Sequence, residues 1–510
     1  MAVQTKAQRF FNLTAAEVKT DSVVSHFCHT EPLPDNYRDS VYTVSIVYPE
    51  FIDMPATDVS NYRRHHSALP PAMPELETNI VFNRRKPFIS TSFCPVVYRS
   101  GKYQLLVSFL LKREASVKGG AKNSAPKRKA DVAPAERYAA HSVLATGKWV
   151  KIRVSASGFH QITESLIRKA GFSDINKVKL YGYGGNLKNE ILNADDLINS
   201  DDLKEVPTYK SGNRRVFYAR GPVSWASNTS TVRTRNPYSD YGYYFLTESA
   251  DAPTTVDAAA MAADTYPTPD DFHSHYEVDA YSWYNGGRNL FDSHSVEVGS
   301  SRTVNIAAPN TDGDQKLVVC VSAGRSCVVQ VAVNDSIVGT VRTSLGDSKY
   351  IFGCRKSATF TVRNIKVDNA VKLTVLEGAA MRLDYITLVS PEPRPMPDLD
   401  SESLPVPEYV YGITNQDRHA DPQADLVIII PTSQKLLKQA QRLKAFHEER
   451  DGLRVNIVPA DELYNEFSSG TPDASAYRHY MKMLYDRAAD EKDMPKYLLL
   501  FGDCVWDNRM

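Results

Sequence analysis

The chain has 510 residues, of which 42% are hydrophobic, and its 60 lysines and arginines balance 60 aspartates and glutamates. This length predicts roughly three to four domains, and the charge balance gives no overall field that would favour nucleic acid or an anionic membrane. No apolar run is long enough to cross a bilayer as a helix. The first twenty residues lack the apolar stretch of a secretory signal, which fits a cytosolic protein or a chain that begins after its signal.

Residues 1–111 are predicted to form a β domain, because "SVYTVSIVYPEF" and "KYQLLVSFLLK" alternate or run apolar and are rich in β-branched and aromatic residues.

The amino-acid composition changes after residue 111. Residues 112–137, "KREASVKGGAKNSAPKRKADVAPAER", are basic and lack large apolar side chains, so this stretch cannot bury a core. Its "PKRK" is typical of a nuclear-localisation or polyanion-binding patch. A solvated flexible linker is the favoured interpretation.

Residues 138–275 are predicted to be a β-rich mixed domain. "VLATGKWVKIRVSASGFHQITESLIRKAGF" indicates two strands and a short helix, capped near Thr163 and ended by Gly171. "KVKLYGYGGN" is a strand that runs into a glycine-rich turn. Its Gly182, Gly184 and Gly185 are not a dinucleotide fingerprint, because no helix opens behind them. We expect these glycines to serve tight backbone geometry.

Residues 276–389 carry strand after strand at regular spacing with turn signals between them, which predicts a β-sandwich. Cys320 and Cys327 flank "VSAGRS", which would place their sulfurs opposite each other if it formed a hairpin. Two separate half-buried thiols are the favoured alternative. The six cysteines show no metal-binding spacing, and we expect no metal site.

Residues 390–408, "SPEPRPMPDLDSESLPVPE", are proline-rich and predict a semi-extended linker. After it the pattern changes to that of an α/β domain in residues 409–510. "ADLVIIIP" is apolar without alternation, as a strand buried in a parallel sheet requires. "LRVNIVPA" and "KYLLLFGD" are the second and third strands.

Two helices are predicted between these three strands. The first has Leu436, Ala440, Leu443 and Phe446 on one face and ends at Gly452. The second opens with Thr471 as its N-cap and proline at the first helical position. Strand–helix–strand–helix–strand predicts a parallel sheet with right-handed crossovers. Three strands make a small sheet, so we expect the domain to be cut short.

The predicted fold class is therefore a multidomain protein. It has β-rich N-terminal regions and a β-sandwich, followed by the start of an α/β parallel-sheet domain. A non-catalytic surface adhesin or carbohydrate-binding protein built from the sandwiches is an alternative, but it leaves the α/β segment unexplained. A third alternative is a small α/β ligand-binding or nucleotide-dependent domain with β decorations. Against it, "IIIPTS" lacks the glycines that let a backbone approach a phosphate.

The last segment resembles the opening of the peptidase domain in the gingipain family of cysteine peptidases, which has a caspase-like α/β fold. The resemblance lies in "VYGITNQDRHADPQADLVIIIPTS", "FHEERDGLRVNIVPADELYNEFSSGTPDASAYRHYMKMLY" and "PKYLLLFGD". Upstream, "VLATGKWVKIRV", "SGFHQIT", "KVKLYGYGGN", "RGPVSW" and "NPYSDYGYYFLTE" resemble the region before the peptidase domain in type IX secretion sortases of Bacteroidota. The resemblance covers about residues 143–510.

This resemblance implies a cell-surface enzyme at the outer membrane. Such an enzyme removes the C-terminal sorting domain from secreted cargo and joins the new end to anionic lipopolysaccharide, working with outer-membrane secretion and attachment proteins. A cysteine thiolate attacks the scissile carbonyl, a histidine moves protons and backbone amides hold the oxyanion. No cofactor and no nucleic-acid partner is implied.

The resemblance also bears on the site residues. In this family the catalytic histidine and cysteine follow strands later than "YLLLFGD", so they are expected beyond Met510, and the 510-residue chain alone is expected to be inactive. Asp503 follows the third strand, where it either helps to order the cleft or caps the next loop. Cys504 is not expected to be the nucleophile, because no base lies near it in sequence and flanking carboxylates raise a thiol's pKa.

We predict that limited proteolysis cuts first within residues 112–137, because a segment without a core is open to protease. We also predict no specific binding of DNA or RNA there. Replacement of Lys127, Arg128 and Lys129 by alanine should leave filter-binding titrations with nucleic acid unchanged. Tight, salt-sensitive binding that the triple variant abolishes would contradict this.

Overall fold

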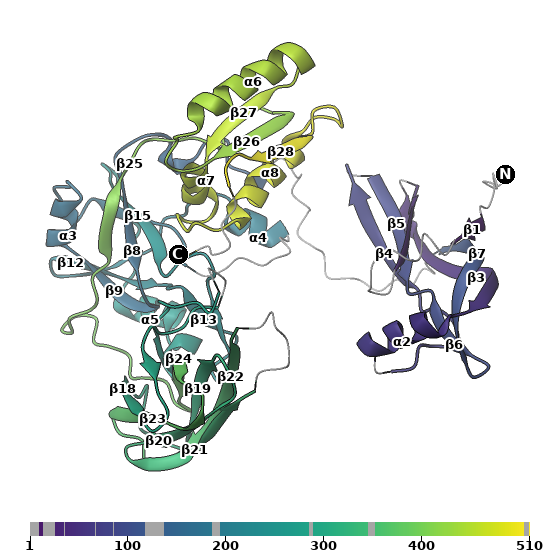
Figure 1. Ribbon diagram of the computed structural model, residues 1–510. Helices are drawn as coiled ribbons and strands as arrows, with labels where there is room; N and C mark the ends of the chain where they lie inside the picture. Colours follow the sequence, from purple (N-terminus) through teal and green to yellow (C-terminus); the bar gives the residue numbers. More distant parts are fainter. Residues whose placement is uncertain are drawn as a thin grey trace. The chain divides into compact units, whose positions relative to one another are not determined.

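The computed structural model describes residues 10–13, 26–34, 36–66, 68–84, 86–117, 137–185, 194–284, 289–344, 352–503 and 509. The chain divides into two compact units, Met1–Asp131 and Val132–Met510, and each is described by itself (Figure 1). Antiparallel sheets dominate both units, and the β-rich multidomain fold class predicted from the sequence is confirmed. Among the helices described, none combines the length and apolar character needed to cross a membrane.

The described residues of the first unit form antiparallel sheets, accompanied by helix α2 (Ala56–His65). Phe93, Leu106 and Phe109 are buried at its centre. The strands of one sheet are β1 (Phe10–Asn12), β3 (Ser40–Asp53), β6 (Val96–Arg99) and β7 (Lys102–Val117), and those of the other are β2 (Phe27–Pro32), β4 (Glu77–Asn83) and β5 (Lys86–Phe93).

The last strand of this unit runs past the predicted boundary at residue 111. Residues 112–117 continue β7 because they pair with residues 40–45 of β3, and backbone pairing satisfies N–H and C=O groups without needing large apolar side chains. The beginning of the predicted linker therefore belongs to the sheet. Residues 118–136, which include the basic "PKRK", lie outside the described residues.

The second unit begins with a β-rich region, whose core contains Ile152, Ile162 and Phe217. Its helix α3 starts as predicted, because the Thr163 hydroxyl accepts a hydrogen bond from the backbone N–H of Leu166 at 3.3 Å. The elements are β8 (Trp149–Val154), β9 (Gly158–Thr163), α3 (Glu164–Lys169), β10 (Val178–Tyr181), α4 (Ala194–Asn199), β11 (Tyr209–Ser211), β12 (Arg214–Ala219), β13 (Val223–Trp225), β14 (Arg233–Arg235), β15 (Gly242–Glu248) and α5 (Ala258–Thr265).

The glycine-rich turn after β10 brings three chain segments into close contact. Gly184 has a φ of 79°, and a Cβ built on it would lie 2.4 Å from the Arg220 carbonyl oxygen. A Cβ on Gly185 would lie 2.8 Å from the Cα of Gly242. No side chain fits at these separations, so the prediction of tight backbone geometry is confirmed.

A β-sandwich follows, and its two sheets enclose a core that includes Val319, Val329 and Leu373. The alternative hairpin between Cys320 and Cys327 is not formed, because their strands belong to different sheets. Both are free thiols and only 1% exposed, more buried than predicted. The sheets are β16 (His273–Glu277), β17 (Ser295–Val296), β19 (Gln315–Ala323), β22 (Cys354–Val362) and β24 (Met381–Val389), against β18 (Ser301–Ala307), β20 (Cys327–Val333), β21 (Ser336–Thr343) and β23 (Asp368–Gly378).

The proline-rich segment 390–408 returns the chain to the β-rich region. This segment packs on that region, because Leu399 and Leu404 are buried against Phe159 and Met261. The next strand, β25 (Glu408–Ile413), pairs with β8 and extends the sheet β10-β15-β8-β25. Residues 408–413 thus belong to the upstream sheet, and the α/β region starts after them.

The α/β region contains the predicted parallel sheet, in the order β27-β26-β28. The central strand is buried throughout because helices cover both of its faces: Val427 and Ile429 pack on α7 and α8, and Ile428 and Ile430 pack on α6. This explains its unbroken apolar sequence. The elements are β26 (Leu426–Ile430), α6 (Leu437–Asp451), β27 (Val455–Pro459), α7 (Ala460–Phe467), α8 (Ser475–Arg487) and β28 (Tyr497–Leu500).

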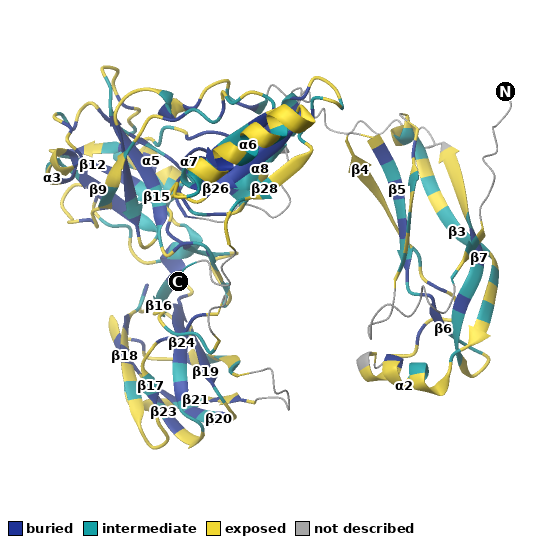
Figure 2. Cartoon of the chain, turned by 45° about the horizontal axis from the view of Figure 1, so that its top comes forward, coloured by how far each residue is buried: buried dark blue, intermediate teal, exposed yellow. Residues whose placement is uncertain are grey.

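Three details of this region differ from prediction. Helix α7 was not predicted. Helix α8 begins at Ser475, whose backbone N–H donates to Asp473 Oδ1 at 2.8 Å, so Asp473 caps the turn and the buried Thr471 does not. Phe446, predicted to be on the packed face, is 47% exposed. Figure 2 shows exposed residues of α6 in yellow. Gly452 ends α6 in the left-handed conformation, as predicted.

A buried histidine joins the α/β region to the upstream one. His419 Nδ1 lies 2.6 Å from Glu466 Oε2 of α7, and Nε2 lies 3.2 Å from Asp201 Oδ1, which follows α4. The imidazole is fully buried and stacks on Phe467. Burial lowers the pKa of His419, but the hydrogen bonds and charges of the two carboxylates outweigh burial and raise the pKa to about 10. The ring is therefore an imidazolium at neutral pH.

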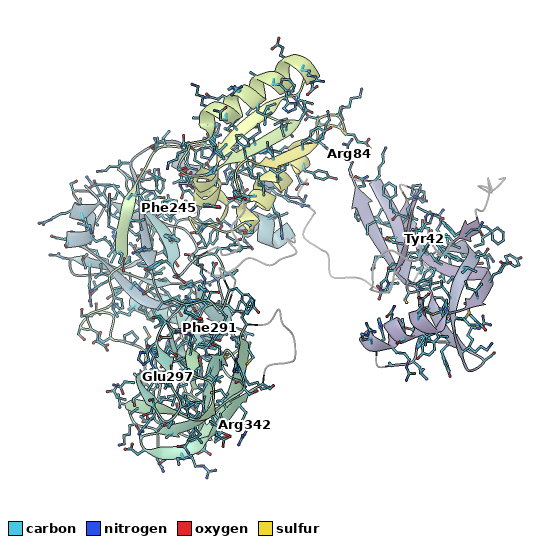
Figure 3. All side chains as sticks on the ribbon, in the orientation of Figure 1. Tyr42, Arg84, Phe245, Phe291, Glu297 and Arg342 are labelled. Atoms are coloured by element: carbon cyan, nitrogen blue, oxygen red, sulfur yellow. The ribbon has the colours of Figure 1, made fainter. Side chains whose placement is uncertain are left out.

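A buried lysine makes a second junction. Lys151 of β8 donates from Nζ to the carbonyl oxygen of Gly470, in the turn between α7 and α8, at 2.6 Å and to Asn465 Oδ1 of α7 at 3.3 Å. Its Nζ lies 4.4 Å from the ring centroid of Tyr243 and 6.0 Å from that of Phe245, which is labelled in Figure 3. Burial lowers the pKa of Lys151 to about 7, although the charge of the Asp461 carboxylate raises it.

We predict that His419→Gln lowers the free energy of unfolding at neutral pH by about 3 kcal/mol, because two buried carboxylates lose their counter-ion. The folded pKa lies above the ordinary value, so this stabilisation is complete below about pH 6.5 and is lost as the pH rises towards 10. The difference between the two proteins should therefore shrink across that range, as measured by urea unfolding at a series of pH values. The surface variant His141→Gln is the control. A difference that stays constant with pH would contradict a charged His419.

The Lys151→Met variant should show the opposite pH dependence. The folded pKa lies below the ordinary value, so between about pH 7 and 10.5 the unfolded state holds a proton that the folded state does not. Wild-type stability relative to the variant therefore rises with pH, by up to about 1.4 kcal/mol per pH unit. Lys148→Met is the matched control, because the exposed Lys148 also donates to a carbonyl oxygen, that of Gly171, at 2.6 Å. A relative stability that falls with pH would refute this assignment.

Candidate functional site

A cleft of about 610 Å³ lies at the carboxyl ends of β26 and β28. Ile430 and Leu500 end these two parallel strands, and the chain continues along the rim as residues 431–433 and 501–503. Ligands of open α/β sheets bind outside the carboxyl ends of the strands, where the loops are free to vary without disturbing the sheet. The cleft is therefore the candidate site of the α/β region.

Two tyrosines form the wall that faces the sheet. Tyr464 of α7 and Tyr477 of α8 stack with ring centroids 5.5 Å apart and are hydrogen-bonded through their hydroxyls. Burial raises the pKa of both phenols. This wall is therefore aromatic and uncharged at neutral pH, and it offers apolar surface with a polar tip.

The turn between α7 and α8 carries Pro472 and Ala474 into the cleft, and the upstream region holds that turn. Ser469 is fully buried there. Its hydroxyl donates to the Tyr243 carbonyl oxygen at 2.9 Å and accepts from the backbone N–H of Tyr183 at 3.0 Å. Together with the Lys151 bond to the same turn, these contacts make the shape of the cleft depend on residues far upstream.

One lining residue comes from the upstream region itself. Tyr238, in the loop between β14 and β15, borders the same cleft as Tyr464 and Leu500. The sequence pattern did not single it out, nor did it single out Tyr464, Tyr477 or Lys151. The motif "NPYSDYG" contains Tyr238, but only the fold shows that it borders the same cleft as a strand end more than two hundred residues later.

Asp503, the residue predicted at the edge of the cleft, lines its rim and is exposed. The structure thus places it at the carboxyl end of β28, beside Thr432 and Ser433 of the neighbouring loop. Its contribution to chemistry stays a prediction. Cys504 lies outside the described residues.

A second group of carboxylates, Glu277, Asp279 and Asp384, has oxygens within 4.8 Å of one another. Each of these carboxylates forms ion pairs with arginines. Arg233 and Arg235 both contact Glu277. The remaining ion pairs join Arg235 and Arg509 to Asp279 and Arg233 and Arg355 to Asp384. These arginines already supply positive charge, so the arrangement is an ion-pair network that ties the sandwich to β14 and to Arg509.

The cleft has the size and lining of a binding site for an organic ligand. Its walls are mainly apolar and aromatic, and the hydroxyls and carboxylate lie at the rim. Such a lining suits a ligand that carries apolar surface together with a few polar groups. Among the described residues, no cysteine or histidine lines this cleft.

Comparisons with known proteins agree with this geometry. Residues 419–510 match the model of Peptidase family C25. Among solved structures, the chain is similar to dimeric latent PorU from Porphyromonas gingivalis, with 27% sequence identity, a TM-score of 0.57, and coverage of 73% of this chain and 43% of that one. The chain thus spans less than half of the length of that PorU chain. No curated protein matches the sequence.

Two carbohydrate-binding modules show a much weaker likeness. A family 35 module from Clostridium thermocellum is 18% identical and CsCBM6-3 from Clostridium stercorarium, solved with cellobiose, is 16% identical, each over 23% of this chain and 88% and 93% of theirs. Both TM-scores are 0.17, too low to support any statement about function. The family match coincides with the parallel sheet and its cleft, and residues 419–510 therefore belong to a Peptidase family C25 (gingipain family) domain, in a chain similar to PorU.

Proposed function

We propose that the protein acts as a cysteine peptidase and sortase at the cell surface. It would remove C-terminal sorting domains from cargo of the type IX secretion system and join the new carboxyl end to anionic lipopolysaccharide. The observation that carries this proposal is the family C25 match at residues 419–510, which coincides with an open cleft at the carboxyl edge of a parallel sheet. The similarity to PorU supports the sortase part.

The chemistry expected of such an enzyme has two steps. A cysteine thiolate adds to the scissile carbonyl, and the amine leaves with a proton from the histidine, which forms an acyl-thioester. Water or an amine of the acceptor then attacks the thioester and releases the thiolate. Backbone amides hold the oxyanion in both steps. The outcome depends on which nucleophile reaches the thioester first.

The part of this chain in that reaction is to bind and place the cargo. The apolar walls would hold the polypeptide, and Asp503 at the rim would order the strand end beside the scissile bond. Outer-membrane association is part of the same proposal and is supported by the similarity to PorU. Secretion and attachment proteins of the outer membrane are its proposed partners. The charge-neutral composition is compatible with that surface location.

The test uses the full-length gene product, because this chain spans 43% of the length of the PorU chain. The protein is incubated with cargo that carries a C-terminal sorting domain, and the released domain and the remaining cargo are weighed by mass spectrometry. We expect release that iodoacetamide abolishes, and a cargo mass increase when an amine acceptor is added. Asp503→Asn should slow release about tenfold, because a small misplacement at the reacting centre is costly.

The exposed Asp264 on α5 gives a matched control, since Asp264→Asn removes the same charge far from the cleft. Release that survives thiol alkylation would refute a cysteine peptidase. Cleavage without any acceptor adduct would leave a peptidase and refute the sortase. An unchanged rate in Asp503→Asn would show that this carboxylate only caps the loop.

A further inference from the structure

The loop that carries Tyr238 to the cleft, residues 236–241, is fixed at its start by Asn236. This side chain is 1% exposed. Its backbone N–H donates to the Pro222 carbonyl oxygen at 2.8 Å, and its side-chain amide donates to the Gly185 carbonyl oxygen at 2.9 Å. Its Oδ1 accepts from the backbone N–H of Tyr238 at 2.9 Å. These hydrogen bonds of Asn236 therefore fix the backbone conformation of the segment that leads to Tyr238.

The second half of the loop is fixed as well. The Ser239 hydroxyl, on a residue that is 5% exposed, donates to the Tyr241 carbonyl oxygen and accepts from the Tyr241 N–H, both at 3.0 Å. Asp240 forms ion pairs with Arg235 at 2.6 Å and with Arg509 at 3.0 Å. The second pair ties the loop to a residue that follows β28 in the chain. Both ends of the Tyr238 backbone are thus held in place, and little conformational entropy is left to lose when a ligand binds.

Tyr238 borders a cleft in which apolar surface is left uncovered. Leu500, which borders the same cleft, is 55% exposed, and so leaves apolar surface to be covered. The apolar and aromatic side chains of the lining are Tyr238, Ile429, Ile430, Pro431, Ala460, Tyr464, Pro472, Ala474, Tyr477, Leu500 and Phe501. A charged group placed between them would lose its hydration, whereas an apolar one would gain contact area.

We propose that Tyr238 is a specificity-determining residue, which forms with Leu500 and Phe501 a subsite for a large apolar or aromatic side chain of a bound polypeptide. The inference rests on the proposed peptidase function and adds the class of side chain that the enzyme selects. A tyrosine suits this position because it supplies a large, stiff contact surface at a small entropy cost. The subsite would be shared between the upstream β-rich region and the peptidase domain, so neither part would recognise the peptide alone.

The experiment compares peptides that differ at one position, with phenylalanine, leucine, alanine or lysine there, and that are otherwise taken from a cleaved cargo sequence. The full-length gene product, Tyr238→Ala and Tyr238→Phe are assayed for cleavage. Tyr238→Ala should lower kcat/KM for the phenylalanine and leucine peptides about tenfold, through KM and with kcat kept. The alanine peptide should be affected little, and Tyr238→Phe should behave as wild type. Fluorescence anisotropy with the same labelled peptides and the 510-residue chain measures binding without chemistry.

Tyr284→Ala is the control, because Tyr284 is 43% exposed on the sandwich and does not line the cleft. Thermal unfolding confirms that each variant is folded. If the chain binds apolar peptides through Tyr238 but the full-length protein cleaves none, the peptidase function fails and the subsite stands. If wild type cleaves cargo but prefers the lysine peptide, or if Tyr238→Ala weakens all four peptides equally, the inference is overturned while the peptidase function stands.

Discussion

The buried imidazolium of His419 holds the peptidase-family segment against the region before it. A buried ion pair stabilises a fold only when its remaining hydrogen-bonding capacity is satisfied, because both charges have lost their hydration. Glu466 meets this condition: it accepts from the Gln416 side chain, from the backbone N–H groups of Arg418 and His419, and from the His419 ring. Asp201 holds the other ring nitrogen. Glu466 belongs to the same region as the histidine and Asp201 to the upstream region, so the second carboxylate meets the ring only when the two regions are docked.

This docking decides the shape of the cleft. Hydrogen bonds from Lys151 and from Ser469 connect the turn between α7 and α8 to the upstream region. Pro472 of that turn lines the cleft. Tyr238 is also part of the lining, on a loop that belongs to the upstream region. The β-rich part of the chain is therefore a structural component of the site. Without it, the cleft would lose Tyr238 from its lining and the contacts that hold the turn between α7 and α8.

Local patterns predicted the elements whose form is decided by their own residues. The apolar run of β26, the Thr163 cap of α3 and the left-handed Gly452 each follow from propensity or burial within a few residues. The cleft could not be read in that way. Tyr238 and Lys151 acquire their roles from contacts across hundreds of residues. At the start of α8, Asp473 and not Thr471 accepts the hydrogen bond from the Ser475 backbone N–H.

The return of the chain through β25 bears on the order of folding. Arg153 of β8 and Glu408 of β25 are ion-paired although 255 residues separate them, so this edge of the sheet closes a very long loop, with a correspondingly large loss of chain entropy. The sandwich lies inside that loop. The first and last strands of the sandwich, β16 and β24, pair with His273 opposite Val389. Once the sandwich has formed, its two ends are adjacent, so only the segments before and after it still contribute to the length of the loop. The order of folding with the smallest loss of chain entropy therefore begins with the sandwich. The pairing of β25 with β8 follows, and the α/β segment docks last.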